Sequence, residues 1–141
     1  MNRDPAAHAR LWRDNVSSGS YLEPQIGFSR AVRIGNTVAI GGTAPIAAGG
    51  GTDCIGDVYG QTKRCLEIAL TALTQAGGTA DDVIRTRIIL TDINTFDAAA
   101  RAHAEVFTDI RPVTTVMAVT AFVDPDWLVE IELDAILKEE T

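Results

Sequence analysis

Three carboxylates alternate along the last predicted strand of the chain. Glu130, Glu132 and Asp134 occupy every second position within 128–137, so they share one face of that strand. A partly buried carboxylate with a raised pKa can accept a proton from water and so act as a general base. The pattern by itself favours a solvated strand face over a catalytic one.

Other residues capable of chemistry lack the neighbours that chemistry needs. His8 and His103 have no second ligand at metal spacing, so no metal site is expected. The three glycines at 49–51 lack the Gly-Lys-Ser/Thr ending of a phosphate-binding loop, so flexibility is the better interpretation. Neither Cys54 nor Cys65 has the neighbours that activate a thiol, and packing is favoured for both.

The composition predicts one soluble globular domain. The chain has 141 residues and a mass of 15.0 kDa, and 46% of its residues are hydrophobic, which fits a single core. The net charge is −7 and the isoelectric point is about 4.7, so binding of nucleic acid is not expected. With no membrane span, no secretory signal and only two cysteines, a cytoplasmic location is expected.

Turn residues and apolar spacing predict the elements that carry these groups. Strands at 29–34 and 37–41 flank the hairpin turn Gly35-Asn36, and 42–56 is predicted as loop. The later elements are a helix at 57–76, a helical turn at 79–82, a strand at 83–91, a helix at 95–108 capped by Asn94, and strands at 113–120 and 128–137. Residues 1–23 are predicted to be an N-terminal arm with a short helix at 6–14, and 24–141 a single domain.

Periodicity assigns faces to these elements. On the strand at 83–91, one face is predicted to hold Ile84, Ile88 and Leu90, and the other Val83, Arg85, Arg87 and Ile89. The buried side of the helix at 95–108 is predicted to hold Phe96, Ala99, Ala100, Val106 and Phe107. On the last strand the apolar face is predicted to hold Val129, Ile131, Leu133, Ala135 and Leu137.

The element order β-β-α-β-α-β-β predicts an α+β fold in which two crossover helices lie on one face of a mixed sheet. Two helices can shield only that face. The other face still carries Ile89, together with either the pair Met117 and Val119 or Val116 alone. This is too much apolar surface to leave in water. A further copy of the chain is therefore expected to cover it, which predicts a homo-oligomer.

An ordered set of short motifs from Gly27 to Leu137 resembles the Rid (reactive intermediate deaminase) family, also called YjgF or endoribonuclease L-PSP. The matching segments are Gly27-Phe28-Ser29-Arg30-Ala31-Val32, 35–45, Gln61 and Leu66, Ala76-Gly77, 82–84, 91–93 with Phe96, Phe107, Arg111-Pro112 and 129–132. The resemblance implies a chorismate-mutase-like fold, a homotrimer with small-molecule sites in the clefts between subunits, and no cofactor or metal. Members of the family hydrolyse reactive enamines and imines, such as 2-iminopropanoate, to the 2-oxo acid and ammonia.

The same resemblance assigns roles to individual positions. Glu130 matches the glutamate that orients the attacking water, and Gly42 matches a glycine whose backbone lines the pocket. The family's carboxylate-binding arginine lies in a Pro-Ala-Arg-Ser motif, which is Pro112-Val113-Thr114-Thr115 here, so Thr114 replaces it. Three further polar residues of the family, a cysteine, an asparagine and a tyrosine, are replaced by Val116, Ala100 and Phe28.

These replacements leave the substrate anchor open. A planar guanidinium pairs with a carboxylate through two hydrogen bonds, and Arg111 lies three residues before Thr114. A surface arginine beside a turn is more often a solvated charge. Arg30, Arg85 and Arg87 are further candidates. The substrate-binding set predicted from the sequence is Arg111, Thr114, Gly42, Thr43 and Phe28, with Glu130 as the catalytic residue.

Three functions follow from these residues, in order of preference. The first is a hydrolytic deaminase of enamine and imine intermediates with altered substrate preference. The second is a non-catalytic trimer that binds a small metabolite, in which loss of the arginine has removed catalysis. The third is an endoribonuclease, which the charge of −7 and the lack of a basic, aromatic-rich stripe disfavour.

Overall fold

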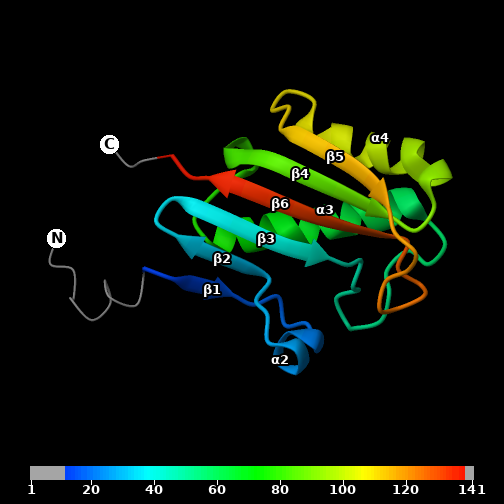
Figure 1. The fold of residues 1–141 in the computed structure, drawn as a ribbon, viewed down its shortest axis with the longest axis horizontal. Helices are drawn as coiled ribbons and strands as arrows, with labels where there is room; N and C mark the ends of the chain where they lie inside the picture. The colour runs from blue at the N-terminus through cyan, green and yellow to red at the C-terminus, as the bar shows by residue number, and fades with distance from the viewer. Residues whose placement is uncertain (1–11, 139–141) are drawn as a thin grey trace, which may run out of the picture.

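The computed structural model describes residues 12–138 as one six-stranded mixed sheet with two long helices on one face (Figure 1). The strands lie in the order β1-β2-β3-β6-β4-β5, and β4 and β5 are the parallel pair. The elements are β1 (Asp14–Val16), α2 (Leu22–Ile26), β2 (Ala31–Ile34), β3 (Thr37–Thr43), α3 (Val58–Gln75), η1 (Ala80–Asp82), β4 (Val83–Leu90), η2 (Ile93–Thr95), α4 (Phe96–Phe107), β5 (Val113–Ala118) and β6 (Val129–Ile136). The predicted α+β fold is confirmed.

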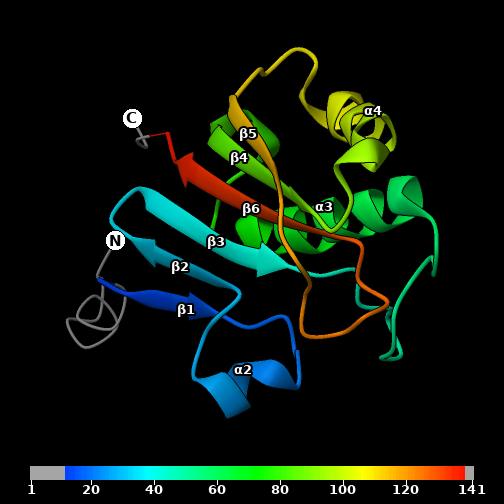
Figure 2. The same ribbon diagram turned by 45° about the vertical axis from the view of Figure 1, so that its right-hand side comes forward.

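The N-terminal part of the described chain is more structured than an arm. Asp14–Val16 forms the edge strand β1, antiparallel to β2, and the short helix α2 follows it. Figure 2 shows α2 below the sheet, apart from the two long helices. Most of the helix predicted at 6–14 lies outside the described residues, and its last residue, Asp14, begins β1. The domain boundary at residue 23 stays a prediction.

The hairpin and the first long helix form as predicted. Gly35 has φ +60°, the left-handed conformation that the turn between β2 and β3 requires, and Ile34 pairs with Thr37 across it. At the start of α3 the Asp57 carboxylate accepts a hydrogen bond from the Gly60 amide. The helix ends at Gln75, where Gly77, with φ +99°, turns the chain back toward the sheet.

A register shift in β4 overturns one predicted face. Thr79 and Asp82 form the predicted capping box before the strand. The pairing of β4 with β6 then shifts between Val83 and Arg85, so simple alternation fails at the start of the strand. Val83 is buried and Ile84 is 47% exposed, the reverse of the prediction. From Thr86 onward the strand alternates regularly, with Ile88 and Leu90 in the core.

Two details of the second long helix also differ from prediction. The Asp92 carboxylate, rather than Asn94, caps the chain here, by accepting a hydrogen bond from the Asn94 amide at the short turn η2. Phe96 is largely exposed because it stands at the first position of α4, ahead of the turns that meet the sheet. The fully buried residues of α4 are Ala99, Ala102 and Phe107, and Ala100 is only partly buried.

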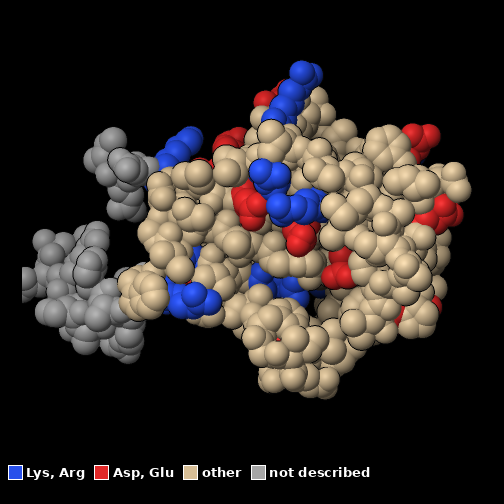
Figure 3. Space-filling view, in the orientation of Figure 1, with Lys and Arg blue, Asp and Glu red and all other residues tan. Residues whose placement is uncertain are grey.

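One face of the sheet is apolar and buried under the helices, and the other face carries charged side chains. On the face covered by α3 and α4, β6 contributes the predicted buried set Val129, Ile131, Leu133 and Ala135, followed by Leu137. On the uncovered face, Arg85 pairs with Asp134, and Arg87 pairs with Asp134 and Glu132, at N–O distances of 3.5–4.0 Å. Figure 3 shows these mixed charges over the middle of the sheet.

Apolar side chains surround the charged cluster on the uncovered face. Met117 lies opposite Ile89 on this face and is 38% exposed, whereas Val116 packs against the core. The register therefore decides between the two apolar sets that the sequence left open, in favour of the one containing Met117.

No helix among residues 12–138 is long and apolar enough to span a membrane.

Truncating the central strand tests the assignment of its faces. Leu133→Ala should lower the free energy of unfolding by about 2–5 kcal/mol, because Leu133 is fully buried and its removal leaves a cavity. Ile55→Ala, at a side chain that is 68% exposed, should change it by less than about 0.5 kcal/mol. Urea unfolding at one fixed protein concentration measures both, and equal losses would contradict the assignment.

Candidate active site

Glu130 lies on the uncovered face of the sheet, near the start of β6. It pairs with Ile89 of β4, and its neighbours Val129 and Ile131 point to the opposite face, into the core. Gln61 of α3 fixes the chain just before it: the side-chain carbonyl accepts from the Leu128 amide at 2.9 Å, and the side-chain amide donates to the Asp126 carbonyl at 2.9 Å. The helix on one face of the sheet thereby sets the position of a carboxylate on the other.

The end of β3 leaves room for this carboxylate. The register between β3 and β6 shifts between Ile40 and Thr43, so Gly41 and Gly42 fall in an irregular stretch. A Cβ atom on Gly42 would lie 3.0 Å from Glu130 Oε1. Any side chain at position 42 would therefore crowd the carboxylate, which gives the predicted site residue Gly42 a physical reason to be glycine.

Burial raises the pKa of the Glu130 carboxyl. The nearby positive charge of Arg30 opposes this rise, and the negative charge of Glu132 adds to it. Among the described residues, none forms a hydrogen bond to the Glu130 carboxylate, and no fully buried polar side-chain atom lacks a partner. The Glu130 oxygens therefore still contact solvent, and a proton acceptor with a raised pKa and access to water is typical of a functional site.

Arg30 provides the cation beside Glu130. Its side chain is only 4% exposed, at the turn into β2. Nη1 donates to the Gly42 carbonyl at 2.6 Å and to Thr43 Oγ1 at 3.2 Å, and Nε donates to Ser18 Oγ at 3.3 Å. Arg30 thus braces the backbone segment against which Glu130 lies.

A second buried carboxylate helps to balance this buried arginine. Glu23 of α2 accepts hydrogen bonds from the Ser18 amide and hydroxyl and from the Ser20 amide, at 2.9–3.2 Å. Its negative charge favours the charged form of Arg30, as that of Glu130 does. A buried charge needs such partners to be tolerated, so α2 and the preceding serines are part of the support of the site.

The other predicted residues near Glu130 divide between two sides. The Phe28 ring lies 5.3 Å from the Arg30 guanidinium carbon, a cation–π contact that places it beside the site. Thr43 is buried, and its hydroxyl donates to the Gly41 carbonyl at 2.7 Å. Its side chain belongs to the covered side of the sheet, away from the Glu130 carboxylate.

Thr114 lies apart from Glu130 within one chain. It pairs with Thr86 on β4, whose side chain is fully buried on the face covered by the helices, whereas Glu130 shares the opposite face with Ile89. Thr114 Oγ1 is 2.8 Å from Thr86 Oγ1, which is in turn 2.8 Å from His103 Nε2 of α4. Thr114 Oγ1 also donates to the Pro112 carbonyl, at 3.2 Å.

His103 completes this chain of hydrogen bonds. Burial lowers the pKa of its imidazole, so the ring is neutral at pH 7. The ring also stacks on Phe107, with centroids 4.6 Å apart. These contacts fit the structural role that the sequence favoured for this histidine.

The remaining arginine candidates are engaged by other groups. Arg111 follows α4 with φ +56°, and its Nε donates to the Thr108 carbonyl at 3.1 Å. Arg85 and Arg87 are held by Glu132 and Asp134 in the charged cluster. Of the four arginines considered from the sequence, Arg30 is the one whose charge acts on Glu130.

Two residues that support the site were underestimated from the sequence. Glu23 falls in the segment predicted as an arm, and Arg30 was only a secondary candidate. One signal in the sequence could have identified this pair. Arg30 stands directly before the β-branched run of the first hairpin, and the acidic Glu23 lies seven positions earlier. No group of three or more His, Cys, Asp or Glu residues in 12–138 is arranged to hold a metal ion.

Comparison with known proteins places this arrangement in a family. The family described as endoribonuclease L-PSP matches residues 19–137. The uncharacterised protein SCO2049 of Streptomyces coelicolor is 41% identical over 123 residues, covering 85% of this chain and 89% of that protein. The 3-aminoacrylate deaminase RutC of Acinetobacter baylyi is 33% identical over 101 residues, covering 72% and 79%.

A solved structure agrees in both fold and sequence. The crystal structure of Rv2704 from Mycobacterium tuberculosis, a member of the YjgF/YER057c/UK114 family, superposes with a TM-score of 0.80 and 45% identity. The match covers 89% of this chain and 99% of that one. With its sheet order, its two crossover helices and this match in sequence and structure, the chain belongs to the endoribonuclease L-PSP family, also known as the YjgF or Rid family.

Proposed function

We propose that this protein is a hydrolytic deaminase of reactive enamine and imine intermediates, with Glu130 as its general base. The observation that carries the proposal is the Glu130 carboxylate itself: half-buried, raised in pKa, and set against the backbone of Gly42. The RutC relative, named a 3-aminoacrylate deaminase, supports the reaction class. Within that class, the replacement of the family's arginine by Thr114 favours an altered substrate preference.

The proposed reaction adds water across a C=N bond. An enamine first tautomerises to the imine, and protonation of the imine nitrogen makes its carbon electrophilic. The water oxygen then bonds to this carbon while Glu130 takes a proton from the water, which gives a carbinolamine. Glu130 returns this proton to the nitrogen. As the C–N bond breaks, the ionised carboxylate takes the proton of the carbinolamine hydroxyl and then releases it to solvent, which balances the proton first added to the imine, and the products are the carbonyl compound and ammonia.

Arg30 tunes this base instead of reacting. Its positive charge opposes the rise in pKa that burial causes and so favours the ionised form of Glu130, which is the form that accepts a proton. Its hydrogen bond to the Gly42 carbonyl also fixes the backbone beside the carboxylate. Arg30 is therefore a positioning residue in this proposal.

The complete site is proposed to form between copies of the chain in a homotrimer. Thr114 and Glu130 lie on opposite faces of one sheet, so only a neighbouring copy can bring the segment at 111–114 to Glu130. In this arrangement Gly42, Thr43 and Phe28 belong to one copy, while Thr114 and Arg111 come from the next and Arg111 supplies the missing guanidinium. The half-exposed apolar residues of the uncovered face give copies a reason to associate.

The alternatives differ from the proposal in identifiable ways. A non-catalytic trimer would bind the same small molecules without turnover. An endoribonuclease would need a basic surface, and the net charge of −7 disfavours it.

We propose a cytoplasmic location, because both cysteines are free thiols.

Turnover of defined substrates tests the reaction. We expect the protein to accelerate loss of 2-iminopropanoate, generated in situ by an amino-acid oxidase, or of 3-aminoacrylate, with release of ammonia. Glu130→Gln should lower kcat at least about 100-fold, because the amide cannot accept the proton of water. The wild-type rate should also fall as the pH drops through the raised pKa of Glu130, at a higher pH than for an ordinary glutamate.

A control variant and a binding measurement make that experiment decisive. Glu67→Gln changes an exposed glutamate of α3 and should leave the rate unchanged. Absence of turnover of both substrates, together with their binding to the wild-type protein, would instead support the non-catalytic alternative.

The stability of Glu130→Gln should depend on pH in a defined direction. A raised carboxyl pKa means that folding disfavours the ionised form, so wild type loses stability as the pH rises from the pKa of an unperturbed glutamate to the raised pKa, and the loss is complete above it. Removing the charge should therefore raise Tm at pH 7, and the gain should disappear as the pH falls toward about 4, where an unperturbed glutamate titrates. Calorimetry across this range measures it. A variant that is less stable than wild type at pH 7 would argue against the burial cost.

Sedimentation equilibrium tests the assembly. We expect a mass of about three times 15.0 kDa for the wild type. Met117→Asp places a charge among the half-exposed apolar residues of the uncovered face and should shift the population to monomer. Ala104→Asp, on the exposed side of α4, should leave the mass unchanged. A wild-type monomer at micromolar concentration would refute a site shared between copies.

A further inference from the structure

A cavity on the covered side of the sheet is unused by the proposed reaction. It has a volume of about 290 Å³ and lies between the segment at 18–21, the loop that follows β3, and α3. This volume is close to the lower end of the range of about 300–1,000 Å³ for ligand pockets.

Arg30 lines this cavity, and one nitrogen of its guanidinium has no hydrogen-bond partner among the described residues. Nε and Nη1 are engaged by Ser18, Gly42 and Thr43, while Nη2 has no hydrogen-bond partner among residues 12–138. Because no fully buried side-chain nitrogen of those residues is unpartnered, Nη2 keeps some exposed surface, and Arg30 is one of the residues that line the cavity. A nearly buried cation that lines a cavity and has an unpartnered donor can bind an anion there.

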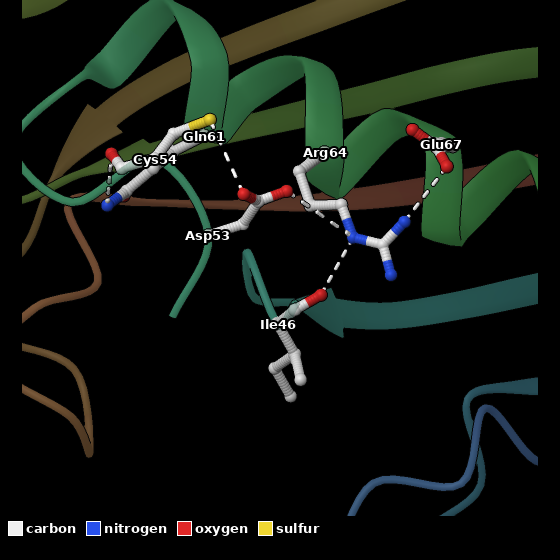
Figure 4. Close-up of polar contacts among 6 residues, drawn as sticks. All are labelled: Ile46, Asp53, Cys54, Gln61, Arg64 and Glu67. Carbon is white, nitrogen blue, oxygen red and sulfur yellow. Dashed lines mark hydrogen bonds and ion pairs between the residues drawn. The ribbon is translucent and has the colours of Figure 1, made fainter. Parts of the chain in front are cut away.

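A second arginine lines the same cavity and holds its outer wall. Arg64 of α3 donates through Nε to the Ile46 carbonyl at 2.7 Å and through Nη1 to Glu67 at 2.9 Å (Figure 4). Figure 4 also shows Asp53 beside the same guanidinium, 4.0 Å from Nε. Arg64 therefore ties the loop at 46–53 to the helix and keeps the cavity in shape.

The lining and the nearby charges define the kind of ligand. Ala44, Ile46 and Ile68 give an apolar wall opposite the polar groups of Ser18 and Ser20. The acidic partners of the two arginines already balance most of their charge. A dianion such as phosphate would be repelled there, whereas a single carboxylate on a short aliphatic chain satisfies both the free Nη2 and the apolar wall.

We propose that this cavity binds a short aliphatic monocarboxylate, with its carboxylate on Arg30 Nη2, as a second ligand site distinct from the one at Glu130. Neither Glu130, Gly42 nor Phe28 lines the cavity. Arg30 Nη1 donates a hydrogen bond to the Gly42 carbonyl, and this contact lies between the two sites and links them. The inference does not depend on deaminase activity.

Titration calorimetry with matched probes tests the site on the full-length protein. We expect 3-methylbutanoate to bind, its neutral counterpart 3-methylbutanamide to bind at least tenfold more weakly, and inorganic phosphate not to bind. Ala47→Leu adds a larger side chain to the cavity wall and should weaken 3-methylbutanoate binding at least tenfold. Ala104→Leu, on the exposed side of α4, should leave it unchanged.

Glu130→Gln separates this inference from the proposed reaction. The variant should lose turnover yet bind 3-methylbutanoate with the wild-type Kd. Loss of binding in this variant would place the ligand at the candidate active site, and unchanged binding in Ala47→Leu would place it elsewhere. Equal affinity for acid and amide, or no binding of the acid, would also overturn the site.

Discussion

The central strand β6 must satisfy two opposite environments at once. It lies between β3 and β4, so its backbone is paired on both edges, and every second side chain is packed under α3 and α4. A shift of one residue would place carboxylates in the core and leucine in water, which makes the register strongly determined. This register places Glu130 on the uncovered face. The hydrogen bonds of Gln61 from α3 to the chain just before β6 help to fix that position.

The charge of Arg30 is the second organising feature. A nearly buried guanidinium is tolerated because carbonyls, hydroxyls and two carboxylates surround it. The same group braces Gly42, opposes the pKa rise of Glu130 and faces the cavity behind β3. Segments that are distant in sequence, α2 with its serines and the end of β3, therefore meet at one side chain. Any ligand that engages Arg30 acts close to the candidate base.

The two faces of the sheet explain why one chain is insufficient for the proposed site. Thr114 is tied through Thr86 to His103 on the helical side, whereas Glu130 faces the uncovered side. No rotation of these side chains can bring them together across a sheet. The mixture of charged pairs and half-exposed apolar groups on the uncovered face is the surface that a neighbouring copy would cover.

Local periodicity and turn chemistry determined the elements from β2 onward, the fold class and the alternation of β6, because these depend on side chains close together in sequence. The sequence also carried the resemblance that singled out Glu130 and Gly42. Tertiary structure decided the exposure of Ile84, which a register shift reverses, and the partners of Arg30 and Glu23. It also decided the separation of Thr114 from Glu130. Such features arise from strand register and from contacts between distant segments, and no local pattern encodes them.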